Sequence, residues 1–130
     1  MEQNQMLKDA LQAVGVNAQY DEDGDLYFLY QMKYVYVTQD EKDQFVSLSF
    51  PNFMEVNEDN LTPAFITCNK ITREVKLLKV FMNSNLNGVS AACEFFYSDF
   101  ESMKNSIQKS LLLIGVVRTL FKKTAKKLSR

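Results

Sequence analysis

The sequence predicts an α+β fold in which an antiparallel sheet is covered by helices, in the order helix, three strands, helix, two strands, helix. Between Leu26 and Phe50, three runs rich in aromatic and β-branched residues follow one another with brief turns between them. Before and after this region, apolar residues recur at the spacing of amphipathic helices. Because 130 residues is an ordinary length for one domain, we expect a single domain over residues 1–130.

The first helix is predicted over Glu2–Val14. Its apolar stripe consists of Met6, Leu7, Ala10, Leu11 and Val14. Gly15 occupies the position at which a left-handed residue commonly ends a helix, and Val16 follows as the apolar residue that often folds back over the last turn. We therefore expect this helix to end at Gly15 and to pack its stripe on the sheet.

An acidic segment, Asp21–Asp25, precedes the first strand and invites comparison with a calcium loop. An EF-hand needs oxygen ligands at positions 1, 3 and 5, glycine at 6 and glutamate at 12. Counted from Asp21, the glycine falls at position 4 and Met32 at position 12. The pattern fails twice, so we interpret the segment as a solvated turn and predict no bound metal.

The first three strands are predicted over Leu26–Met32, Tyr34–Thr38 and Val46–Phe50. On the first strand, neither side is cleanly polar. On the third, apolar residues alternate with Ser47 and Ser49, which is the pattern of a half-buried antiparallel strand. Pro51 has no N–H to donate, so we expect it to end the pairing of this strand.

The second helix is predicted to begin at Thr62-Pro63, an N-cap residue followed by proline, and to end near Thr72. A hairpin follows, with strands over Val75–Met82 and Val89–Tyr97. Asn87-Gly88 between them is a strong local turn signal. These elements complete the expected sheet.

The last helix is predicted from a cap at Ser98 or Asp99 to about Leu128, and it carries two apolar stripes. One stripe is formed by Phe100, Met103, Ile107, Leu111, Ile114, Phe121 and Ala125. A second, roughly opposite, is formed by Leu112, Leu113, Val116 and Leu120. Three interpretations of the second stripe stay open: it packs against the first helix, it meets another chain, or it inserts into a membrane surface.

The residue content argues against an enzyme and against a cofactor. Histidine is absent, which removes the commonest general base and the usual zinc ligand. The four glycines are isolated, so no phosphate-binding loop is present. Cys68 and Cys93 lie in apolar segments, as expected for buried thiols in a reducing cytoplasm. We expect a cytoplasmic protein, because neither a secretory signal nor a membrane-spanning run is found.

Charge is divided unevenly along the chain, although the net charge is −1. Acidic residues dominate between Tyr20 and Asn60, and basic residues dominate after Ser98. The strand tyrosines could stack nucleic-acid bases, but their acidic surroundings argue against nucleic-acid binding. The opposed charges are expected in solvated faces. The alternative is a basic C-terminal helix that meets an anionic ligand or a membrane surface.

Five segments together resemble the YbjN family of small bacterial proteins, which share the type III secretion chaperone-like fold. The segments are MLKDALQAVGV, DGDLYFLY, FVSLSFP, the AFITCNKIT helix with Asn69, and the long closing helix. The resemblance implies a regulatory protein without a defined reaction. Secretion chaperones of this fold are homodimers that hold extended segments of client proteins.

In those dimers the short helix and the strand after it commonly meet the partner. Carried onto this chain, the resemblance implies that Phe65, Cys68, Asn69 and Thr72 contact a partner together with the strand Val75–Met82. The second stripe of the last helix, formed by Leu112, Leu113, Val116 and Leu120, is the other candidate interface. We therefore expect a non-enzymatic module that binds a protein or peptide client, as a homodimer.

Overall fold

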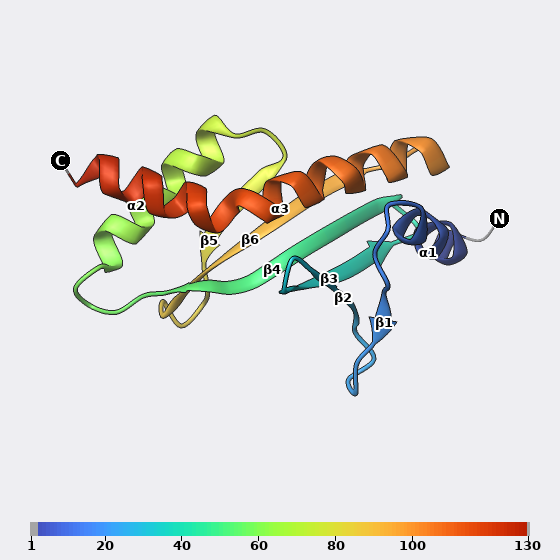
Figure 1. Cartoon of the computed structure of the whole chain (residues 1–130), viewed down its shortest axis with the longest axis horizontal. Helices are drawn as coiled ribbons and strands as arrows, with labels where there is room; N and C mark the ends of the chain where they lie inside the picture. The colour runs from blue at the N-terminus through green and yellow to red at the C-terminus, as the bar shows by residue number, and fades with distance from the viewer. Residues whose placement is uncertain (1–2, 130) are drawn as a thin grey trace.

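The computed structural model describes residues 3–129 and contains three helices and six strands within them (Figure 1). In chain order the elements are α1 (Gln3–Ala13), β1 (Gln19–Tyr20), β2 (Leu26–Tyr30), β3 (Lys33–Asp40), β4 (Phe45–Glu55), α2 (Leu61–Glu74), β5 (Leu78–Met82), β6 (Gly88–Phe96) and α3 (Phe100–Leu128). Glu2, where the sequence predicts the first helix to begin, lies outside the described residues. The predicted α+β order is confirmed.

The strands of the described chain form one sheet in the order β1-β2-β3-β4-β6-β5, and every neighbouring pair is antiparallel. The sequence did not indicate β1, in which Gln19 and Tyr20 pair with Tyr27 and Leu26. Two residues are too few to show an alternating pattern. β5 begins at Leu78, three residues later than Val75, because Leu77 has a positive φ of 74° that interrupts an extended strand.

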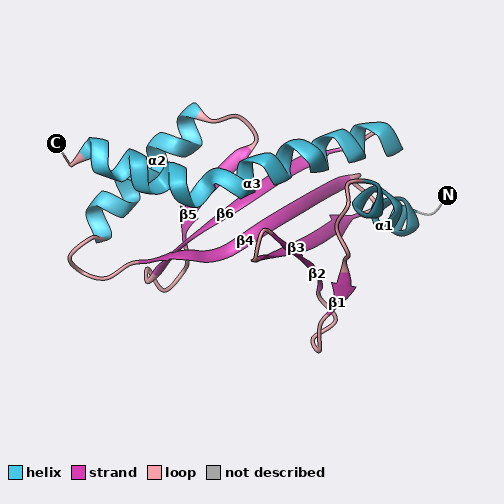
Figure 2. Ribbon diagram, viewed as in Figure 1, coloured by secondary structure: helices cyan, strands magenta, loops and turns pink. Residues whose placement is uncertain are grey.

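The core lies between the sheet and the helices α1 and α3, and α3 runs along the strands (Figure 2). The sheet contributes Phe28, Val35, Val46, Leu48, Val89 and Cys93, all fully buried. Met103, Ile107 and Ile114 of α3 pack on them from above, and Leu7 and Leu11 of α1 do so near the N-terminal half of α3. Burying each large side chain contributes about 1.5–3 kcal/mol. α2 packs against β5 and the C-terminal half of α3.

β4 continues past Pro51, so the prediction that this proline ends the strand is wrong. Pairing with β6 is interrupted between Phe50 and Met54 and then resumes to Glu55. Asn52 in the interruption has a positive φ of 50°, and its backbone N–H donates to the Ser90 hydroxyl over 2.9 Å. This bulge places the proline where a ladder hydrogen bond is already missing.

The helix ends follow the sequence in two places and depart from it in a third. Gly15, with a φ of +91°, ends α1, and Val16 packs against the core as expected, with its N–H donating to the Leu11 carbonyl. Asp99 caps α3 by accepting from the Ser102 N–H over 2.8 Å. By contrast, α2 begins at Leu61, one residue before the predicted cap at Thr62, and ends at Glu74.

Candidate functional site

The sheet face opposite α1 and α3 carries a row of aromatic and apolar side chains that remain accessible. The register places Tyr27, Leu29, Tyr34, Tyr36, Phe45 and Phe96 on this face, between the buried residues of the same strands. Leu29 and Tyr34 are each 55% exposed and Phe96 is 72% exposed. Large apolar side chains gathered on one surface mark an interaction site more often than single exposed ones do. We call these six residues the open face.

Two aromatic groups stand at the two ends of the open face. In the first, the Tyr27 ring lies 5.9 Å from the rings of both Tyr34 and Tyr36. In the second, the Phe45 and Phe96 rings are 5.1 Å apart. Such ring pairs fix one another in place, which keeps the exposed surface preorganised.

Small and polar side chains separate the two aromatic groups. Ser49 and Ala92 lie beside Tyr36 in one row, and Ser47 and Glu94 occupy the next row. Lys79 of β5 pairs with Glu94 over 3.3 Å. The open face therefore has aromatic side chains at both ends and smaller, mostly polar side chains between them.

A cleft of about 640 Å³ opens beside the tyrosine group, where β3 and β4 separate. Tyr36 and Ser49 are the last residues that pair these two strands before β4 bulges away. The cleft is lined by Gln31, Met32, Lys33, Tyr34, Tyr36, Phe50, Pro51, Asn52, Phe53, Gly115, Arg118 and Thr119. It therefore lies between the β2–β3 turn, the β4 bulge and the middle of α3.

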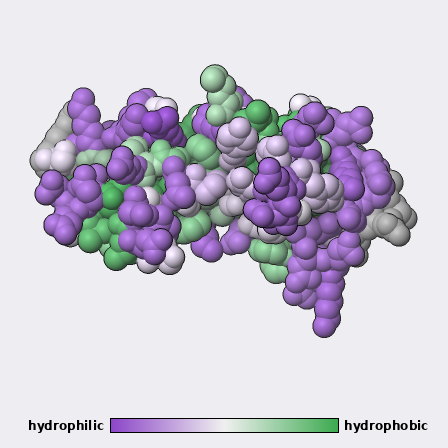
Figure 3. All heavy atoms as spheres, turned by 90° about the horizontal axis from the view of Figure 1, so that it is seen from below, coloured by the Kyte–Doolittle hydropathy of each residue, from purple (hydrophilic) through white to green (hydrophobic). Residues whose placement is uncertain are grey.

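The predicted contact residues of α2 do not share one surface. Phe65 and Asn69 are exposed, but Cys68 is buried in the core. The Thr72 hydroxyl accepts from the Val80 N–H over 2.8 Å and donates to the Val80 carbonyl over 3.0 Å. At the end of the molecule that holds α2, hydrophobic side chains gather on the surface (Figure 3). A partner role for these residues stays a prediction.

The second stripe of α3 is divided by the fold. Leu113 and Leu120 are half-buried against the core, whereas Leu112 is 70% and Val116 is 54% exposed. α1 does pack on α3, but it leaves these two side chains in solvent. The interpretation that the whole stripe completes the core is therefore wrong for Leu112 and Val116.

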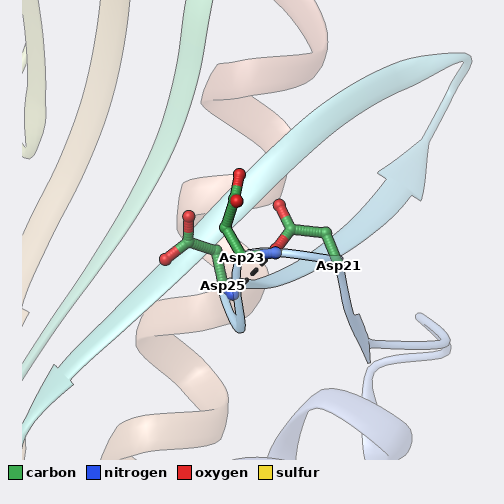
Figure 4. Close-up of side chains that lie close together, drawn as sticks. All are labelled: Asp21, Asp23 and Asp25. Carbon is green, nitrogen blue, oxygen red and sulfur yellow. Dashed lines mark hydrogen bonds between the residues drawn. The ribbon is translucent and has the colours of Figure 1, made fainter.

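The acidic segment folds as a turn whose carboxylates point outward from one loop (Figure 4). An Asp21 carboxylate oxygen accepts from the N–H groups of Asp23 and Asp25 over 3.0 and 2.8 Å. One oxygen from each of these three aspartates lies within 4.8 Å of the others. Because the Asp21 oxygen is already used by the backbone, the cluster is explained by turn formation.

The two thiols are free and buried, and neither is suited to nucleophilic chemistry. Burial raises the pKa of Cys68 to about 11 and that of Cys93 to about 11. The nucleophile in thiol chemistry is the thiolate, and a thiol with such a pKa stays protonated at neutral pH. Both cysteines serve as small core residues.

No family model and no curated protein sequence matches this chain. Solved structures do match. YbjN of E. coli, a candidate transcription regulator, superimposes with a TM-score of 0.71 over 95% of this chain and 93% of that chain, at 14% identity. The chain has the fold of YbjN and of the type III secretion chaperones. The resemblance expected from the sequence is confirmed at this level.

Two complexes that contain chaperones are among the further matches. A chain of the HopA1–SchA chaperone–effector complex gives a TM-score of 0.54 at 9% identity and covers 85% of this chain and 87% of that one. A chain of the complex between the Yersinia pestis chaperone SycH and a fragment of YscM2 gives 0.52 at 8% identity, covering 91% and 96%. Among residues 3–129, no helix is long and apolar enough to cross a membrane.

The open face and the cleft are the features that sequence reasoning missed. The signal for the open face was present, since the strand Leu26–Met32 has apolar residues on both sides and Phe95-Phe96 must place one ring on each side of β6. The cleft left no such signal. It depends on a bulge in β4 and on its distance from α3.

Proposed function

We propose that this protein is a non-enzymatic module that holds extended segments of a client protein against its open face. The observation that carries the proposal is the exposure of Leu29, Tyr34 and Phe96 on one side of an otherwise well-packed sheet. The fold supports it, because chains with this fold were solved in the HopA1–SchA chaperone–effector complex and in the complex of the chaperone SycH with a fragment of YscM2. Residues 1–130 are proposed to form the single domain that does this.

The arrangement of the open face suggests what kind of segment fits. Tyr36 lies in one aromatic group, and Asp40 lies opposite Phe45 in the other, four residues along β3. At about 3.3 Å per residue, the two groups are about 13 Å apart along the strand. An extended client segment aligned with β3 would contact both aromatic groups if it had apolar side chains four residues apart. Small side chains between those two positions would cover the polar residues in the middle of the open face.

We propose that the homodimer expected from the sequence forms through Leu112 and Val116. Both side chains are exposed on the same side of α3, one helical turn apart. Met32, which is 96% exposed, adds a third apolar side chain, because it belongs to the β2–β3 turn that contacts α3 at Gly115. Covering these side chains would remove apolar surface from water without disturbing the core.

The alternative function, binding of an anionic ligand or membrane surface by the C-terminal half of α3, has less support. Lys122, Lys123, Lys126 and Lys127 are exposed there, but the apolar side of this half is turned inward, with Phe121 and Thr124 buried. An interfacial helix needs an apolar face free to enter the lipid. The lysines also lie where positive charge favours a helix C-terminus.

Peptide binding tests the proposal directly. The assay measures the fluorescence polarisation of two sets of fluorescein-labelled 15-residue peptides. One set has two leucines four residues apart, and the other has two adjacent leucines. We expect preferential binding of the first set and at least a tenfold loss for the double variant Leu29→Ser, Phe96→Ser. Leu128→Ser removes an exposed apolar side chain near the end of α3 and is the matched control. Equal binding by all three proteins would refute the proposed surface.

A further inference from the structure

The cleft between β3, β4 and α3 adjoins the open face: it shares Tyr34 and Tyr36 with the tyrosine group, and its other lining residues lie outside the open face. It exists because the sheet separates: Lys33 and Tyr34 pair with β2 on one side but have no partner on β4. Its volume of about 640 Å³ lies within the range of small-molecule sites, roughly 300–1,000 Å³. The cleft is therefore large enough for a compact organic ligand.

The charged residues that line the cleft are all basic. Lys33 and Arg118 line it, and no aspartate or glutamate does. Neither cation forms a salt bridge with any carboxylate of the described chain. Lys33 is held at the rim, where its ammonium group donates to the Gln31 carbonyl over 3.3 Å. In a protein whose net charge is −1, this local excess of positive charge favours an anionic ligand.

The remaining lining gives the ligand an apolar part. Four aromatic side chains, Tyr34, Tyr36, Phe50 and Phe53, contribute to the walls. Gln31, Asn52 and Thr119 are further polar residues of the lining. An inorganic anion would leave the aromatic walls unused, whereas an acid with an apolar body would use both parts of the lining.

Backbone strain is concentrated around the same cleft. Six non-glycine residues of the described chain have a positive φ, and three of them, Gln31, Met32 and Asn52, line it. Gln31 and Met32 are not the residues that a tight hairpin turn prefers. Strained residues of this kind persist where the surroundings hold them in place, and they cluster at ligand sites.

We propose that this cleft binds a small carboxylic acid with an aromatic or apolar body. The carboxylate pairs with Arg118 and Lys33, and the body packs against the four aromatic walls. Two sources share this chemistry: a free organic acid, and the carboxyl terminus of a peptide that ends in an apolar residue. The cleft shares Tyr34 and Tyr36 with the open face, but its two cations, Lys33 and Arg118, lie outside the open face, so the proposal does not require client binding there.

Isothermal titration of the full chain distinguishes the chemistry and the source. The probes are 3-phenylpropionate, its neutral amide, and two copies of a peptide ending in phenylalanine, one with a free carboxylate and one amidated. We expect both free carboxylates to bind the cleft and both amides to bind at least tenfold more weakly. If only the phenylpropionate binds, the ligand is a free acid; if the peptide carboxylate binds more tightly, the source is a peptide. Equal binding of acids and amides would overturn the proposal.

Three exposed positions on α3 provide the matched variants. Arg118→Gln removes a cleft cation and is expected to weaken 3-phenylpropionate binding at least tenfold. Thr119→Trp fills the cleft and is expected to abolish it. Lys126→Gln removes an exposed cation outside the lining and should leave it unchanged. Thermal melts confirm that each variant folds.

The variants also separate this proposal from the open-face proposal. Unchanged affinity in folded Arg118→Gln and Thr119→Trp would refute the cleft. The Leu29→Ser, Phe96→Ser protein, which fails in the client assay, should still bind 3-phenylpropionate, because neither residue lines the cleft. Loss of small-acid binding there would show that the two sites are one.

Discussion

The hydroxyl of Thr72 forms two hydrogen bonds with the backbone of Val80: it accepts from the N–H over 2.8 Å and donates to the carbonyl over 3.0 Å. Val80 lies on β5, which is an edge strand of the sheet. One side chain of α2 thus occupies the hydrogen-bonding groups that an edge strand would otherwise offer to another chain.

Replacing Thr72 by valine should lower the free energy of unfolding and should make the edge strand β5 available for pairing with another chain. Valine keeps the shape of threonine but leaves the Val80 N–H and carbonyl without their partner, which costs about 1–3 kcal/mol. Chemical denaturation should show this loss, and light scattering should show greater self-association at high protein concentration. Thr62→Val, at an exposed position in the first turn of α2, is the control and should change neither. A stability equal to wild type would mean that water replaces the hydroxyl without loss.

Gly88 and Asn52 are coupled through space. A Cβ at Gly88 would lie 2.6 Å from the Asn52 side-chain oxygen, which is itself held by the Asn83 amide over 2.9 Å. We expect Gly88→Ala to destabilise the protein by about 1–3 kcal/mol, because the asparagine pair must separate. In an Asn52→Gly background the same substitution should cost much less. Chemical denaturation of the four proteins completes the double-mutant cycle, and additive effects would contradict the contact.

Asp99 should give α3 a pH-dependent cap. Hydrogen bonds from the backbone and side chain of Ser102 hold the pKa of Asp99 below its ordinary value. Because the folded-state pKa is lowered, the charged cap contributes stability above the unfolded pKa, about 3.9, and this contribution is lost as the pH falls through the folded value. The difference in melting temperature between wild type and Asp99→Asn should therefore shrink as the pH falls from 6 into the acidic range. A constant difference would argue against the cap.

The thiols of Cys68 and Cys93 should resist modification in the folded protein. Burial raises the pKa of each to about 11, and the unfolded value is about 8.5. Iodoacetamide at pH 8, followed by mass spectrometry, should therefore label neither cysteine in buffer and both in denaturant. Because the folded pKa is raised, the contribution of the two thiols to stability should be constant below about pH 8 and should be lost as the pH rises towards 11. Rapid labelling of the native protein would show that the core opens there.

Leu112 and Val116 test the dimer. Both are exposed, so the double variant Leu112→Asp, Val116→Asp should remain folded and, in light scattering, should be a monomer at concentrations at which the wild type is a dimer. Leu113→Asp is the contrasting variant: its side chain packs on the core, and we expect a loss of several kcal/mol in stability. A wild-type monomer, or a dimer that survives the double substitution, would exclude this interface.

Local chemistry explains why much of the fold was predictable. The alternation of Val46 and Leu48 with Ser47 and Ser49 indicates a strand in any context, and Asp99 caps a helix through atoms only three residues away. The continuation of β4 past Pro51 was not predictable in this way. It requires the Ser90 hydroxyl, 38 residues away from Asn52 in the chain, to receive the displaced N–H.

The same distinction between local and long-range information applies to the candidate sites. The sequence shows that four residues of the candidate sites are apolar, but it does not show that they are exposed to solvent: Leu29, Phe96, Leu112 and Val116. A stripe on a helix is core or surface according to what packs against it, and α1 covers only part of α3. The cleft joins Lys33 and Arg118, which are separated by most of the chain, so no local pattern could reveal it.

By itself, the amino-acid sequence determined the kinds of element, their order apart from the short strand β1, and the shortage of groups suited to bond-breaking chemistry, because these depend on residue type and on short-range periodicity. Only the tertiary structure decided which side of the sheet stays uncovered, where the strands part, and which apolar residues remain in water. Those outcomes depend on contacts between residues far apart in the chain, and such contacts form only when the whole molecule packs.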